Sequence, residues 1–163
     1  MISTFLVTYP WLTTTALMLL IVVGPLAGAW LADRPRATRV LLGLSIAAVL
    51  VLTFAPASRE LEIGCSVEWD LPRLGAVELM ANVILFVPVV LLAGVLTRRP
   101  ILMVAVASGA SVLIELVQAF ATVFGRSCST NDWLANTLGA LLGAVLAVAA
   151  LWLARSFQAR IRR

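Results

Sequence analysis

Residues 76–120 read AVELMANVILFVPVVLLAGVL, TRRP, ILMVAVASGASVLIELVQAF, and this stretch decides the fold. Two apolar runs, at 76–96 and 101–120, stand on either side of a short turn with two arginines and a proline. A run of about 20 apolar residues is long enough to cross the hydrocarbon core of a bilayer as an α-helix. Because the turn is so short, the two helices must lie side by side and antiparallel. The stretch therefore predicts a helical hairpin inside a membrane.

Three further apolar runs lie outside this hairpin, at about 11–32, 40–55 and 133–154. The whole chain of 163 residues is 62% apolar and 12% charged, whereas a soluble domain is about 45–50% apolar and about 25% charged. Five spans leave no room for a separate soluble domain. We therefore predict an all-α fold in which residues 1–163 form a single transmembrane domain, a bundle of five transmembrane helices.

The arginines predict the orientation of this bundle. Three basic residues fall in the connections before the third and fifth spans, namely Arg59, Arg73 and Arg126. The other nine of the 12 stand in the two short turns and the C-terminal tail: Arg34, Arg36, Arg39, Arg98, Arg99, Arg155, Arg160, Arg162 and Arg163. Positive residues concentrate on the cytoplasmic side of membrane proteins. We therefore expect the N-terminus outside and the C-terminus in the cytoplasm.

The charge and residue types also restrict the chemistry. Basic residues at the edges of apolar runs are typical of membrane topology and not of nucleic-acid binding. The chain has no histidine and two cysteines, so it lacks the local patterns of zinc, haem and Ser-His-Asp sites. We expect no cofactor, no metal and no nucleic-acid partner.

Polar side chains interrupt the span 101–120 on one face. Ser111, Glu115 and Gln118 follow each other at i, i+4 and i+7, which places them on one side of an α-helix. Glu115 lies about 8 Å below the outer end of that helix. An unpaired carboxylate at this depth costs about 2.5–3.5 kcal/mol, so Glu115 must face protein or water, form a pair, or be protonated.

The neighbouring spans carry polar residues at the same depth, and Arg126 is a nearby cation able to form a bidentate pair with a carboxylate. We predict an outward-facing binding pocket lined by Glu78, Asn82, Ser111, Glu115, Gln118, Arg126, Asp132 and Asn136. Within this pocket, Glu115 and Asp132 are the candidate catalytic residues. Taken singly, Asn82, Gln118 and Asn136 also fit a purely structural role as interhelical hydrogen-bonding groups.

Two pairs of residues predict structural contacts. Gly139 and Gly143 stand four residues apart in the last span, a spacing that lets a second helix approach closely. Cys65 and Cys128 fall in two connections assigned to the oxidising exterior, which predicts a disulfide between them. Thr130 or Asn131 is expected to cap the last helix.

The polar motifs together resemble a known family. Asn82 to Pro88 (NVILFVP), the Ser111-xxx-Glu115-xx-Gln118 pattern, and the run from Gly125-Arg126 through Asp132 and Asn136 to Gly143 resemble the VanZ-like family of small bacterial membrane proteins. The resemblance covers about 78–146. Where the family usually has a glycine after the Phe-x-Pro element, this chain has Val90.

The resemblance implies a multi-pass protein of the bacterial cell membrane. It also implies a contribution to glycopeptide resistance, because the name-giving member is linked to teicoplanin. Our leading expectation is recognition of an anionic or polar group of a lipid or cell-wall precursor, with Arg126 as the anion clamp. An intramembrane carboxylate-dependent enzyme, a small transporter or flippase, and a non-catalytic modulator of a partner protein remain open, as does the oligomeric state.

Overall fold

The computed structural model describes residues 8–54, 64–71, 75–120 and 128–161. Its helices are α2 (Trp11–Leu31), α3 (Pro35–Phe54), α4 (Val77–Thr97), α5 (Pro100–Phe120) and α6 (Thr130–Ile161). Two short strands, β1 (Cys65–Ser66) and β2 (Cys128–Ser129), pair in parallel. Within the described ranges, five helices are long and apolar enough to cross a membrane. The predicted all-α membrane bundle is therefore confirmed.

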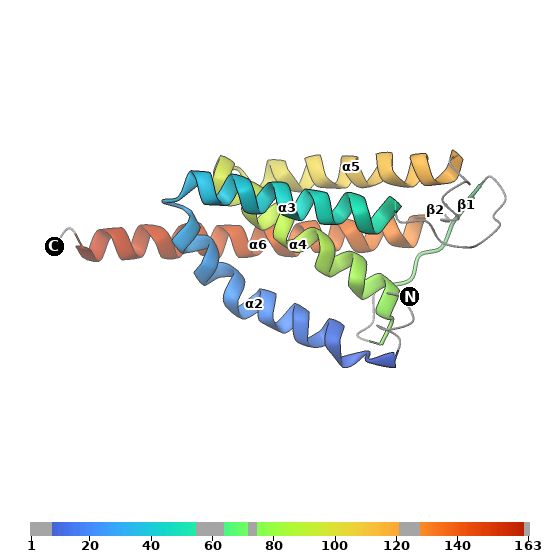
Figure 1. The fold of residues 1–163 in the computed structure, drawn as a ribbon, viewed down its shortest axis with the longest axis horizontal. Helices are drawn as coiled ribbons and strands as arrows, with labels where there is room; N and C mark the ends of the chain where they lie inside the picture. Colours follow the sequence, from blue (N-terminus) through green and yellow to red (C-terminus); the bar gives the residue numbers. More distant parts are fainter. Residues whose placement is uncertain (1–7, 55–63, 72–74, 121–127, 162–163) are drawn as a thin grey trace.

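The five helices form an elongated bundle (Figure 1). The strands, the starts of α2, α4 and α6, and the ends of α3 and α5 lie at one end, which we call the strand end. The α2–α3 turn, the α4–α5 turn and the end of α6 lie at the opposite end, which we call the turn end. Under the orientation that the arginines predict, the strand end is the outer end.

Helices α4 and α6 form the centre of the bundle. About half of the residues in the apolar windows of these two helices are buried, 56% in α4 and 50% in α6, against 17% in α2 and 11% in α3. The contact between them is backbone against backbone, because a Cβ on Gly139 would overlap the Val83 carbonyl oxygen and one on Gly143 would lie 2.6 Å from the Val87 carbonyl oxygen. Helices α2, α3 and α5 surround this pair and expose most of their apolar surface.

The observed helices extend past two of the expected spans. Helix α3 starts at Pro35 instead of about residue 40, because proline has no N–H and is favoured at the first helical position. Thr38, only 1% exposed, fixes this start by donating to the Leu31 carbonyl at 2.9 Å. Helix α6 has 32 residues, a length of about 48 Å, whereas the hydrocarbon core is about 30 Å thick. Part of α6 therefore lies outside that core.

Candidate functional site

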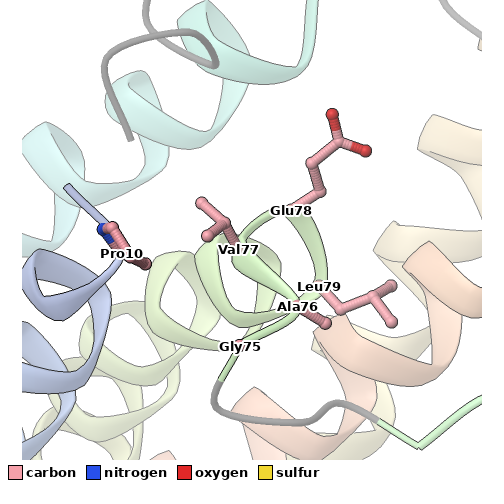
Figure 2. Close-up of a pocket in the computed structure, with 6 residues that line it drawn as sticks. All are labelled: Pro10, Gly75, Ala76, Val77, Glu78 and Leu79. Atoms are coloured by element: carbon pink, nitrogen blue, oxygen red, sulfur yellow. The ribbon is translucent and has the colours of Figure 1, made fainter. Parts of the chain in front are cut away.

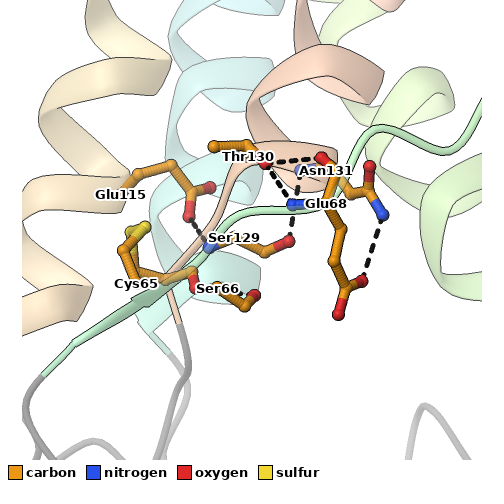
Figure 3. Close-up of a disulfide and its surroundings, with 8 residues drawn as sticks. Cys65, Ser66, Glu68, Glu115, Ser129, Thr130 and Asn131 are labelled. Atoms are coloured by element: carbon orange, nitrogen blue, oxygen red, sulfur yellow. Dashed lines mark hydrogen bonds between the residues drawn. A yellow bond between two sulfur atoms is a disulfide. The ribbon is translucent and has the colours of Figure 1, made fainter.

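Glu115 is buried near the strand end of α5. Its side chain is 7% exposed, and its Oε2 accepts a hydrogen bond of 2.9 Å from the backbone N–H of Ser129 (Figure 3). This partner is neutral, and it lies in β2 just before α6. The carboxylate therefore joins α5 to the connection that leads into α6.

Residues 64–71, which we call the strap, lie beside this contact, because β1 in the strap pairs with β2. The predicted disulfide is confirmed, because Cys65 of the strap is bonded to Cys128 with their Cα atoms 4.5 Å apart. The β1–β2 pairing places Cys65 opposite Cys128 and Ser66 opposite Ser129. The strap is thus fixed beside Ser129, whose N–H binds Glu115 (Figure 3).

Hydrogen bonds continue the attachment along the start of α6. The Glu68 N–H donates to Thr130 Oγ1 at 2.8 Å, and that hydroxyl donates back to the Glu68 carbonyl oxygen. The Asp70 N–H donates to Asn131 Oδ1 at 2.8 Å, and Asn131 Nδ2 donates to Glu68 Oε2 at 3.3 Å. The expectation that Thr130 or Asn131 caps α6 is wrong. The helix starts at Thr130, and the residue before it, Ser129, accepts the Asn131 N–H at its Oγ at 3.1 Å. The side chains of Thr130 and Asn131 bind the strap instead.

A second polar contact lies one helical turn further into the bundle. Asn136 Nδ2 donates to Ser111 Oγ at 2.9 Å, and the two residues are 3% and 0% exposed. The other polar atom of this amide, Asn136 Oδ1, is buried and has no hydrogen-bond partner in the part of the chain that the structure describes. The polar face continues to Ser108 and Thr137, whose hydroxyl oxygens lie 3.0 Å apart.

The remaining predicted residues form contacts between elements. Asn82 Nδ2 on α4 donates to Asp132 Oδ1 on α6 at 2.8 Å. Gln118, 6% exposed, donates from Nε2 to the Thr53 carbonyl oxygen of α3 at 3.0 Å. The structure therefore brings α4, α5 and α6 together through polar pairs, with α3 joined by Gln118. Thr53 had no sequence signal, because its contribution is a backbone carbonyl.

One predicted pocket residue, Glu78, lies away from these polar pairs. Glu78 is exposed and lines a shallow pocket of about 410 Å³ between the start of α2 and the start of α4. Figure 2 shows Pro10 facing Val77 across it, with the Glu78 carboxylate extending away from Pro10. Arg126 lies outside the described residues. Within the described residues, no group of three or more His, Cys, Asp or Glu side chains is placed to hold a metal ion.

We call the polar residues of α4, α5 and α6 near the strand end the outer polar cluster. Ser111, Glu115 and Asn136 in it are buried, and Asn82 and Asp132 are half-buried. Apart from the disulfide, the contacts of the strap with Cys128, Ser129, Thr130 and Asn131 were not predicted. One sequence signal for the strand pairing was present, because Cys65-Ser66 and Cys128-Ser129 have the same two residues and pair in register.

A helical bundle with buried carboxyl and amide groups near one end defines a multi-pass membrane protein with a polar cluster inside its membrane domain. The VanZ/LLP1 family model matches residues 11–153, and the chain belongs to this family. The match confirms the resemblance and extends beyond 78–146 to include α2 and α3. No curated protein and no solved structure matches the chain.

Proposed function

We propose that this VanZ/LLP1-family protein resides in the bacterial cell membrane and uses the outer polar cluster to bind a polar or anionic group of a lipid or cell-envelope molecule. By binding such a molecule it would change envelope composition or glycopeptide access, and so contribute to resistance to glycopeptides such as teicoplanin. Arg126, in the connection before β2, is the proposed anion clamp.

The burial of Glu115 carries this proposal. A carboxylate that only held α5 against α6 would be an expensive choice, because burying its charge costs free energy that one neutral N–H donor offsets only in part. A serine or glutamine would make the same contact without that cost. Within the described residues Glu115 has one neutral donor, and we infer that Arg126 or a polar group of a ligand supplies its remaining stabilisation.

The unpartnered Asn136 Oδ1 supports the same proposal. A buried acceptor without a donor costs about 1–3 kcal/mol. Asn136 stands one helical turn after Asp132 on α6, and its partner Ser111 stands one helical turn before Glu115 on α5. The unpartnered oxygen is therefore about one turn from the two carboxyl groups. A water molecule or a polar group of a ligand would satisfy it. The cluster thus retains hydrogen-bonding capacity beyond its internal pairs.

A second candidate function is carboxylate-dependent catalysis on a lipid or cell-wall precursor. Glu115 and Asp132 have different partners, a backbone N–H and a side-chain amide. Two carboxyl groups in unlike surroundings are the usual basis for dividing acid and base roles. Under this alternative, Glu115→Gln would abolish turnover while leaving binding intact.

The test is glycopeptide susceptibility in a host that lacks the protein and expresses single variants. We expect Glu115→Gln to lose the susceptibility shift that the wild-type protein gives, and Arg126→Lys to reduce it because lysine has no planar fork. Glu78→Gln is the matched control, since it removes an exposed carboxylate at the same end. Normal activity of folded Glu115→Gln protein would reject the proposal.

A further inference from the structure

The turn end of the bundle is strongly basic. Six arginines of the described chain stand there, all of them exposed: Arg34, Arg36, Arg39, Arg98, Arg99 and Arg155. They come from three separate parts of the chain, the α2–α3 turn with the start of α3, the α4–α5 turn, and α6. To orient the protein in the membrane, these arginines need only stand in the cytoplasmic connections. Whether the three parts also lie close together depends on how the helices pack.

Close packing brings these three parts together. A Cβ on Gly28 of α2 would lie 2.8 Å from the Ala150 Cβ of α6, and one on Gly94 of α4 would lie 2.9 Å from the Ala147 Cβ of α6. Gly28 stands six residues before Arg34, and Gly94 stands four and five residues before Arg98 and Arg99. Helices α2 and α4 therefore both pack closely on α6 near the turn end, and the two turns that carry the arginines lie at this same end of the bundle (Figure 1).

The carboxylate nearest in sequence does not neutralise this surface. Asp33 is the one acidic residue in the two turns and the tail, and both of its oxygens accept hydrogen bonds from Gln158 Nε2, at 2.9 and 3.1 Å. Among the residues that the structure describes, none of the six arginines forms an ion pair with a carboxylate. Their charge is available to an anion from outside the chain.

Arg34 is held against Trp30. Its Nη1 donates to the Trp30 carbonyl oxygen at 2.9 Å, and its guanidinium carbon lies 3.8 Å from the centroid of the Trp30 ring. Tryptophan is enriched at the boundary between hydrocarbon and headgroups, and Trp30 is 57% exposed. One of the five guanidinium donors is used in this contact, which fixes the group and leaves others for a ligand.

We propose that the turn end binds the phosphate headgroups of anionic phospholipids in the leaflet beside it. The acyl chains of such a lipid would lie along the exposed apolar sides of α2 and α3, directly below the arginines. Guanidinium groups bind phosphate oxygens through paired, charge-assisted hydrogen bonds. This inference does not depend on the outer polar cluster, which lies at the opposite end.

The test measures lipid binding to purified protein by native mass spectrometry, with phosphatidylglycerol as the anionic lipid and phosphatidylcholine as the neutral one. We expect the wild-type protein to retain phosphatidylglycerol in preference, and added salt to weaken that preference because exposed charges are screened. The variant Arg34→Gln with Arg99→Gln removes one arginine from each turn. At about fivefold per basic residue, it should weaken phosphatidylglycerol binding by about 25-fold at low ionic strength.

A charge-matched control separates a local surface from general charge. Arg59→Gln with Arg73→Gln also removes two positive charges, from the connection between α3 and α4. It should leave phosphatidylglycerol binding within about twofold of wild type, and Arg34→Lys with Arg99→Lys should keep most of it. Equal retention of the two lipids by wild-type protein, or equal losses in the two glutamine pairs, would overturn the proposal. Arg36→Gln with Arg98→Gln, which also removes one arginine from each of the two basic parts of the turn end, replaces the first pair if that variant does not fold.

Discussion

Glu115 combines burial, a helix long enough to cross a membrane and a neutral partner. Its side chain is 7% exposed and its described hydrogen bond comes from the Ser129 N–H. Glutamine at this position keeps a carbonyl oxygen for that N–H and removes the cost of burying a charge. Replacing Glu115 by glutamine therefore separates a structural role from a functional one more sharply than a substitution at any other residue of the cluster.

We predict that Glu115→Gln leaves the free energy of unfolding equal to or slightly above that of wild type, by up to about 1 kcal/mol. Thermal denaturation in detergent measures it. A large fall in melting temperature would mean that the carboxylate itself holds the bundle together.

Gln118→Leu is the companion at the same face of α5. Gln118 donates to the Thr53 carbonyl oxygen across the α3–α5 contact, and hydrogen bonds of this kind between membrane helices average about 0.6 kcal/mol. We predict a loss of stability below about 1 kcal/mol and unchanged glycopeptide susceptibility. Loss of the susceptibility phenotype in this variant would extend the functional residues to α3.

At the scale of elements, the α4–α6 contact depends on two glycines of α6. We predict that Gly139→Ala destabilises the protein by about 3 kcal/mol or prevents folding, because the new methyl group meets the Val83 carbonyl oxygen and backbone has little freedom to move. Gly109→Ala on α5 is the control, since nothing lies within 4 Å of a Cβ there. It should be neutral or stabilising by up to about 1 kcal/mol. Denaturation of both variants checks this, and similar losses would contradict the packing assignment.

The strap pairs with β2, whose Ser129 N–H binds Glu115. Its disulfide joins residues 63 positions apart, and in the chain-entropy model a closed loop of that length contributes about 4 kcal/mol. We predict that Cys65→Ser with Cys128→Ser lowers the melting temperature, and that unreduced wild-type protein takes up no alkylating reagent. Two alkylated cysteines in the unreduced protein would rule out the bond.

Sequence predicted the helices better than it predicted the strap. Long apolar runs report helices directly, and the i, i+4 and i+7 spacing of Ser111, Glu115 and Gln118 correctly grouped three buried residues. The strap contacts join residues about 60 positions apart, such as Glu68 and Thr130, and no local pattern specifies which partner each side chain takes. For the same reason the cap of α6 was predicted at Thr130 or Asn131, one or two residues after Ser129, whose Oγ accepts the Asn131 N–H.

At the scale of the whole molecule, charge is divided between the two ends. Most arginines stand in the two short turns and the tail, whereas six of the eight acidic residues stand in the connections before α4 and α6 or in the first turns of these helices. This division predicts that the strand end faces outward. A reporter active only in the cytoplasm should work when fused after Arg163 and fail when fused after Gly64 or Gly125. The reverse pattern would place the outer polar cluster on the cytoplasmic side.

The most direct test of the central claim is the identity of the molecule that co-purifies with the protein. Wild-type protein, Glu115→Gln and Gln118→Leu are purified from the same membranes, and their lipids and lipid-linked envelope molecules are extracted and identified by mass spectrometry. We predict that one species with a polar headgroup is enriched over bulk membrane in wild-type and Gln118→Leu protein and is lost from Glu115→Gln. Extracts that match bulk membrane composition in all three proteins would contradict a ligand-binding role for the outer polar cluster.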